Sequence, residues 1–383
     1  MAVIKISPST RFLNRRLFAA SIGLLAGLLG ISCAVGVSHA DPGATGTPAR
    51  QATECTSSRD LFLNPFNSHS AHHRPIGTEA QYASDSHPST VSWLQNTSQS
   101  ININVGAPWG VSVATTNASD PIFTIGPTNL KCDRPQGFPR TIRLPQEGFI
   151  TPVRLSRSGC TDGVVVIYDR DQQIPHQIRQ YNWNDGSPLG GQYRTWDIRG
   201  LGHGTHPGDR VGTSASGVAA LFGVLRGEEI NDPNNKVEHA LQMGLPRNPG
   251  HCAMMLSREV VLPAVTGDGS MFMEGHNLGN IPYGGLMALL PSTKGGPDLD
   301  KLGLSARGKR LAETVRDYGI YAVDGANCAA IRADQYVINP GELVAALSAI
   351  YPYMRMVLNN DVLGSPTAGG GNPRAPNCAF DVR

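Results

Sequence analysis

Charged residues are scarce in this sequence, at 16% of 383 residues, and aromatic residues reach only 6%. There is also no marked basic excess, because 32 lysines and arginines stand against 30 aspartates and glutamates. Proteins that bind nucleic acid or anionic membranes need clustered positive charge. The composition therefore favours neither nucleic acid nor a membrane surface as a partner.

C-x-x-C spacing is also missing, although the chain has seven cysteines, and this argues against a thiol redox motif or a zinc knuckle. Six of the cysteines follow residue 40, an even number that predicts disulfides in an oxidising compartment: Cys55, Cys132, Cys160, Cys252, Cys328 and Cys378. Proximity along the chain alone suggests that Cys132 pairs with Cys160 and Cys328 with Cys378. Many other connectivities are equally allowed.

The first forty residues contain no acid and four basic residues: Lys5, Arg11, Arg15 and Arg16. An apolar run over 17–37 follows, and small residues occupy Ser38 and Ala40. This order predicts a secretory signal peptide cleaved after Ala40. A retained membrane anchor is the alternative, and a lipoprotein modified at Cys33 is a weaker one. Cleavage would leave 28 basic and 30 acidic residues, and a secreted or periplasmic protein with no stable membrane span.

The rest of the chain shows no internal repeat or linker, and its low-complexity stretches, 42–51 and 365–376, lie near the ends. We expect four parts. These are the signal peptide (1–40), a flexible segment (41–54), a single globular β-rich domain (55–364) and a loose C-terminal tail (365–383) tethered by Cys378.

Glycine and proline are abundant, with 44 and 28 residues, and together with the scarce charge they favour short strands joined by turns. The expected strands are 100–105, 110–114, 121–125, 141–144, 163–168 and 177–182. The expected helices are 218–225, 305–317 and 340–358. The fold class predicted is mainly β, with a β-sandwich or jelly-roll-like core and a few peripheral helices.

A polar, glycine-rich stretch over 195–210 is the densest group of functional side chains. We expect Trp196, Arg199, His203 and His206 to bind a substrate there, since glycines let a ligand approach the backbone closely. An ordinary surface loop is the alternative. A metal held with Asp197 or Asp209 is less favoured, because two imidazoles on a loop are not pre-oriented, so neither metal nor cofactor is expected.

Two other groups of residues are not expected to take part in catalysis. Residues 212–217 resemble a nucleophile elbow, but the G-x-S-x-G spacing fails for both Ser214 and Ser216, so capping and close packing suit these small residues better. The histidines at 69, 72 and 73 follow the start of the expected domain and receive no role.

Carboxylates at strand ends are the main catalytic candidates. Asp169 closes the run 164–168, and Asp324 follows 318–323. Brought close together, they would suit general acid and base work on a glycosidic bond, whereas turn formation explains each one equally well. His239 is a candidate base or a partly buried structural histidine, and Glu229 and Tyr318 complete the catalytic set.

Several motifs follow one another along the chain: Asn64-Pro-Phe-Asn67, 163–169, Ser214-Ala-Ser-Gly217, 223–230, Glu238-His-Ala-Leu241 and 318–325. Their order resembles that of a group of secreted bacterial proteins, most of them uncharacterised. The resemblance implies export and one domain but no particular reaction, and it matches at Asp169, Glu229, His239 and Asp324. The chain departs from the pattern at 214–220 and in the loop 203–209, so no role passes to His203 or His206.

Together these features predict a secreted carbohydrate-active enzyme, a glycoside hydrolase or polysaccharide lyase, acting on an extracellular or cell-wall polysaccharide. A non-catalytic glycan-binding or surface protein is the alternative from another class. A metal-dependent esterase built on His203 and His206 is a weaker one.

Overall fold

The structure is a computed structural model that describes residues 60–67, 69–97, 100–128, 135–145, 162–184 and 187–363. All of these residues belong to one compact unit, Thr53–Arg383. The expected signal peptide, the segment 41–54, the C-terminal tail and four cysteines, namely Cys55, Cys132, Cys160 and Cys378, lie outside the described residues. Of the helices described, none combines the length and apolar character that crossing a membrane requires.

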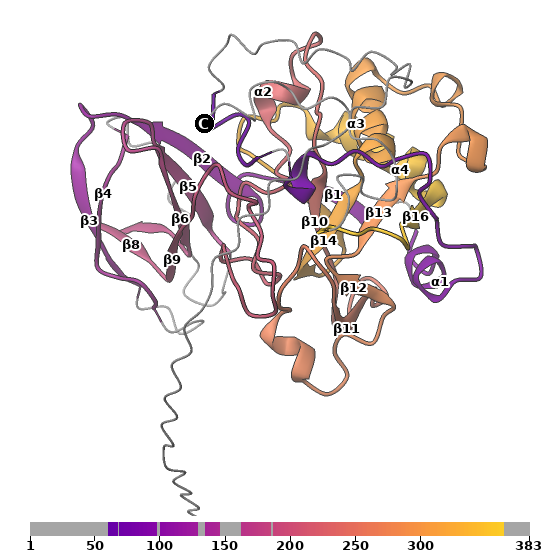
Figure 1. Ribbon diagram of the computed structural model, residues 1–383, viewed down its shortest axis with the longest axis horizontal. Helices are drawn as coiled ribbons and strands as arrows, with labels where there is room; N and C mark the ends of the chain where they lie inside the picture. The colour runs from indigo at the N-terminus through magenta and orange to yellow at the C-terminus, as the bar shows by residue number, and fades with distance from the viewer. Residues whose placement is uncertain are drawn as a thin grey trace, which may run out of the picture. The chain divides into compact units, whose positions relative to one another are not determined.

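The expectation of a mainly β fold with few short helices is confirmed. The largest sheet has six strands in the order β1-β15-β10-β14-β13-β16, with parallel and antiparallel neighbours (Figure 1). Its strands are β1 (Ile101–Val105), β10 (Leu241–Pro246), β13 (Leu286–Leu289), β14 (Ile320–Ala326), β15 (Ala329–Ala333) and β16 (Met354–Met356).

Two four-stranded sheets form a small β-sandwich, with Ile125 and Ile142 of one sheet packing against Val165 and Ile167 of the other. One sheet contains β2 (Val111–Thr116), β5 (Val164–Asp169), β6 (Ile174–Arg179) and β9 (Gln192–Thr195). The other contains β4 (Arg140–Arg143), β3 (Ile122–Pro127), β8 (Ser187–Gly190) and β7 (Asn182–Asn184). A separate pair joins β11 (Leu256–Val260) and β12 (Ile281–Tyr283).

The apolar run of β5 reflects burial on both faces. Successive strand residues point to opposite sides. Val165 and Ile167 enter the sandwich core, whereas Val164 and Val166 enter a second core. That second core also contains Val323 and other residues of the six-stranded sheet, so β5 lies between two apolar layers. A strand covered on both sides reads as continuous rather than alternating hydrophobicity.

Two helices cover the opposite face of the six-stranded sheet, where Leu311 of α3 and Leu347 of α4 pack with Met243 (Figure 1). The side chain of Ser305 caps α3 by accepting a hydrogen bond from the Gly308 amide at 3.0 Å. The α-helices are α1 (Pro88–Leu94), α2 (Gly227–Ile230), α3 (Ala306–Asp317) and α4 (Pro340–Ile350). Short 3-10 helices occupy Ala71–His73, Gly269–Phe272, Ser292–Lys294, Leu299–Lys301 and Tyr351–Tyr353.

The helices expected at 305–317 and 340–358 are therefore present, the second ending earlier, but the helix expected at 218–225 is not. That segment forms turns, and Gly223 has φ +77. Nearly every side chain from Val218 to Leu225 is buried, so the apolar run fills a core without a polar helix face.

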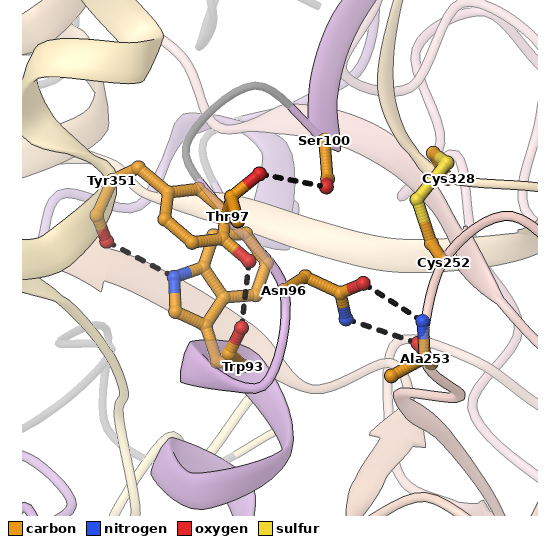
Figure 2. Close-up of a disulfide and its surroundings, with 8 residues drawn as sticks. All are labelled: Trp93, Asn96, Thr97, Ser100, Cys252, Ala253, Cys328 and Tyr351. Carbon is orange, nitrogen blue, oxygen red and sulfur yellow. Dashed lines mark hydrogen bonds between the residues drawn. A yellow bond between two sulfur atoms is a disulfide. The ribbon is translucent and has the colours of Figure 1, made fainter.

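A disulfide joins Cys252 to Cys328, and the suggested pairing of Cys328 with Cys378 is therefore wrong. Proximity along the chain misled the prediction, because the two cysteines are 76 residues apart in sequence. Figure 2 shows the surroundings, where the Asn96 side chain makes two hydrogen bonds with the backbone of Ala253. The disulfide thus ties the loop after β10 to the turn between β14 and β15.

Candidate functional site

A β-bulge in β14 decides where Asp324 points. Ala322 lies opposite Met243 of β10, and Asp324 lies opposite the next residue, Gly244. Val323 is therefore an extra residue with no partner on β10. A bulge of this kind re-aims the side chains that follow it, and bulges are common beside functional sites.

The bulge brings Asp324 to the same side of the sheet as Arg332. Met243 and Ile331 face the core beneath α3 and α4, so their neighbours Gly244 and Arg332 face the other way. Asp324 shares the face of its partner Gly244. A Cβ atom on Gly244 would lie 3.0 Å from the Cβ atom of Ala326, so this glycine lets β10 pass close to the end of β14.

Arg332 joins two carboxylates that lie far apart in the sequence. Its Nη2 atom lies 2.8 Å from Asp324 Oδ2 and 2.8 Å from Asp162 Oδ2. Asp162 stands just before β5, and Arg179, at the end of β6, donates to it at 3.0 Å. Burial raises the pKa of Asp162, but the guanidinium groups of Arg332 and Arg179 outweigh it, so the net pKa is lowered.

Further polar groups surround the pair. Arg247 follows β10, forms an ion pair with Asp268 and lies against Gly325, where any side chain would collide with it. The Gly325 amide donates to Asp324 Oδ1 at 2.9 Å, and the Ala215 amide reaches Oδ2 at 3.4 Å. We call the following residues the arginine–aspartate cluster: Asp162, Arg179, Arg247, Asp268, Asp324 and Arg332.

Solvent reaches this cluster. The side chains of Asp162 and Asp324 are 20% and 12% exposed, whereas Arg332 between them is 7% exposed. The two carboxylates are thus held by one buried donor, Arg332, and are themselves partly exposed. This combination suits a binding or catalytic site better than a purely structural ion pair.

Asp169 is not part of this site. It is buried, accepts a hydrogen bond from Arg143 at 2.8 Å, and accepts further bonds from the amides of Asp171 and Gln172. It also ends β5, whereas Asp162 precedes the start of that strand, and seven residues of extended chain span about 20 Å. The structure does not bring Asp169 and Asp324 together.

His239 and Glu229 do meet, in a second polar group. His239 Nε2 lies 3.0 Å from Glu229 Oε2, and the imidazole stacks on His72 with ring centroids 4.3 Å apart. Burial lowers the pKa of His239, but the charge and hydrogen bond of Glu229 more than compensate, so the net pKa is raised. We call the following residues the histidine cluster: His72, His203, Glu229 and His239.

The histidine cluster is closed by its own hydrogen bonds and by aromatic rings. His203 accepts from the Ala71 amide at 3.4 Å and lies 2.8 Å from the Gly204 carbonyl through its other nitrogen. Burial lowers the pKa of His203. Phe222 packs against both His72 and His203. These contacts suit a structural role within the second core.

The other predicted site residues do not line one surface. Trp196 and Tyr318 are buried in the second core, and His203 is buried as well. Arg199 and His206 are exposed. Arg199 donates to Gln173 at 2.5 Å, and His206 contacts Thr205. Among the described residues, no group of three or more histidines, cysteines, aspartates or glutamates is arranged to hold a metal ion.

The sequence prediction missed Asp162, Arg179 and Arg332. The signal available was Arg332 itself, which interrupts the otherwise apolar strand β15. A guanidinium in such a strand needs a buried carboxylate partner. Sequence alone does not reveal that the partners come from the segment just before β5 and from a bulged position.

A cavity of about 460 Å³ lies apart from both clusters, between α1, β11, β12 and β16. Its polar lining includes His87, Glu259, Asn280 and Asn360. Asn280 already donates to Ser92 at 2.8 Å, and His87 caps α1. Glu259 is the one carboxylate in the lining, and no residue of either cluster contributes to it. The cavity therefore lacks the paired acids that the proposed chemistry needs.

Comparisons of the chain with protein-family models, curated proteins and solved structures found no match.

Proposed function

We propose that this protein is an exported carbohydrate-active enzyme that hydrolyses a polysaccharide at the arginine–aspartate cluster. The observation that carries the proposal is the contact of two carboxylates with one nitrogen atom. Asp162 Oδ2 and Asp324 Oδ2 each lie 2.8 Å from Arg332 Nη2, so these oxygens are at most twice that distance apart.

This separation fits one of the two known geometries of glycoside hydrolysis. Retaining enzymes place their carboxyl groups about 5 to 5.5 Å apart, whereas inverting enzymes need about 6.5 to 9.5 Å to admit a water molecule between acid and base. The short separation favours retention of configuration at the anomeric carbon.

The surroundings suggest which carboxylate has which role. Asp162 is held ionised by two guanidinium groups, as a nucleophile must be. In the first step an oxygen of Asp162 attacks the anomeric carbon while protonated Asp324 gives its proton to the departing glycosidic oxygen. In the second step Asp324 takes a proton from water, whose oxygen displaces Asp162 and regenerates both groups.

A specific observation also favours the non-catalytic alternative. Arg332 and the Gly325 amide both donate to Asp324, so both of its carboxylate oxygens already have hydrogen-bond partners within the protein. A protein that only binds glycan through this cluster would show saturable binding without products.

The two candidates separate in one experiment. Purified protein is incubated with a panel of extracellular and cell-wall polysaccharides, and new reducing ends are measured. The proposal expects release from at least one polymer, and Asp324→Asn should reduce it by at least about 10³-fold. Asp85→Asn is the matched control, since Asp85 pairs with Arg355 at an exposed position elsewhere. Binding without release, or full activity in Asp324→Asn, would contradict hydrolysis at this site.

A further inference from the structure

Arg210 is a cation beside the arginine–aspartate cluster that the acids of the cluster do not neutralise. Its guanidinium donates to the carbonyl oxygen of Ser214 at 2.8 Å, within the loop whose Ala215 amide approaches Asp324. In the described part of the chain, no carboxylate lies within ion-pair distance of Arg210, while Asp162, Asp268 and Asp324 pair with other arginines.

Other arginines add to the positive electrostatic potential around Arg210. Arg210 interacts electrostatically with Arg194 and Arg179 as well as with Asp324. Arg194 is exposed on β9, and the described residues offer it no ion-pair partner either. Burial, followed by the repulsion from Arg194, lowers the pKa of Arg210. A half-buried guanidinium among other guanidinium groups is stabilised when an anion binds.

The position of Arg210 is fixed by the backbone. Gly217 has φ +84, and a side chain there would lie 3.3 Å from Arg210 Cγ, so the absence of one leaves space for the arginine stem. The same loop hydrogen-bonds Ser214 Oγ to the Val218 carbonyl at 3.0 Å. The guanidinium is therefore presented by an internally bonded loop.

We infer that the substrate is an anionic polysaccharide and that Arg210 binds a carboxylate or sulfate group on a sugar unit next to the cleaved bond. This inference rests on the proposed function and names its substrate class. A guanidinium offers paired donors that match the oxygens of a carboxylate, and it serves a sulfate in the same way.

Binding in an inactive background tests the inference separately from cleavage. Isothermal titration of the Asp324→Asn variant would use three probes: polygalacturonate, the same polymer after carboxyl reduction, and dextran sulfate. We expect one anionic polymer to bind at least about 10-fold more tightly than the reduced polymer, with an affinity that falls as salt rises. The two anionic probes tell a carboxylate from a sulfate.

Variants assign the effect to the loop. Adding Arg210→Ala should remove the preference for the anionic polymer, and Arg210→Lys should restore part of it. Arg170→Ala is the matched control, because it removes one exposed guanidinium at the opposite end of β5. Equal affinity for charged and neutral polymers, or an unchanged preference in Arg210→Ala, would overturn the inference.

The two proposals fail differently. Cleavage of neutral polymers with no charge preference would contradict the anionic substrate and leave the hydrolysis proposal intact. Charge-selective binding that depends on Arg210, without cleavage of any polymer, would contradict hydrolysis and leave the binding inference intact.

Discussion

The arginine–aspartate cluster and the histidine cluster are both groups of ionisable side chains gathered from distant parts of the chain, but they differ in what pairs with their acids. The acids are similarly exposed, with side chains 20% exposed at Asp162, 12% at Asp324 and 16% at Glu229. The partner of Glu229 is an imidazole, His239, which is 6% exposed and stacked on His72. In the first cluster, Arg332 joins the two acids. In the second, Phe66 and Phe222 pack against His72.

This difference teaches that a perturbed ionisable group is not by itself a functional one. His239 and Glu229 form a pair that could move a proton, yet the imidazole is buried, stacks on His72 and lies 2.9 Å from the Ala240 carbonyl through its other nitrogen. Asp162 and Asp324 are partly exposed too, but they share one guanidinium, so two carboxylates lie close together. The convergence of two acids, rather than exposure alone, therefore distinguishes the group that can meet a substrate from the group that supports the fold.

The largest expected difference between the clusters is in turnover. Asp162→Asn should lower polysaccharide cleavage by about 10³-fold or more, which corresponds to about 4 kcal/mol of transition-state free energy. Initial rates per folded molecule on a polymer selected from the panel would measure this. His239→Gln is the comparison, and a comparable loss of specific activity in that variant would remove the distinction between the clusters.

Removing the disulfide should come next in size. Cys252→Ser should lower the free energy of unfolding by about 2 to 4 kcal/mol, because the crosslink restricts the unfolded chain. It should also raise KM, since the bond ties the loop bearing Arg247 to the turn after Asp324. Urea unfolding and steady-state kinetics check both effects. A stability loss with unchanged KM would show that the cluster does not depend on this tie.

Breaking the imidazole–carboxylate pair should destabilise the fold without affecting the reaction. Glu229→Gln should lower the free energy of unfolding by about 2 kcal/mol, because it leaves His239 buried without its charged partner. Urea unfolding measures the change. The specific activity of the folded fraction should match the parent protein, and a selective loss of activity would give this cluster a role in catalysis.

The free energy of unfolding should also depend on pH, with opposite signs for two histidines. The pKa of His239 is raised, so its contribution to stability is complete below pH 6.5 and is lost as pH rises through the folded-state pKa. Burial lowers the pKa of His176 to about 4, so stability falls, by up to about 3 kcal/mol, as pH drops from 6.5 towards 4.

Urea unfolding across this pH range, repeated with His239→Gln and His176→Gln, would assign each slope. The His239 variant should lose the decline above pH 6.5, and the His176 variant should lose the decline below it. Unchanged slopes in both variants would show that other groups govern the pH dependence.

Much of the fold could be predicted from the sequence because it depends on local patterns. Local sequence patterns predict three of its elements. The cap at Ser305 marks the start of one helix, Pro340 marks the start of another, and a continuous apolar run predicts β5. The segment 218–225 misled the same reasoning, since an apolar run that fills a core cannot be told from a short buried helix by its period.

The site could be predicted only in part, because it depends on register. Asp324 was selected as a strand-end carboxylate, but its partner Arg332 becomes a neighbour only through the bulge at Val323. Asp162 reaches Arg332 from the segment just before β5, a strand of another sheet. Asp169 had the same local pattern as Asp324 and serves instead to hold Arg143 and the following turn.

The stereochemistry of cleavage tests the central claim most directly. Proton NMR recorded during hydrolysis of a polymer that the protein cleaves would identify the anomer formed before mutarotation. The paired carboxylates on Arg332 predict a product that keeps the anomeric configuration of the substrate. An inverted product would contradict the assignment of Asp162 and Asp324 as nucleophile and acid.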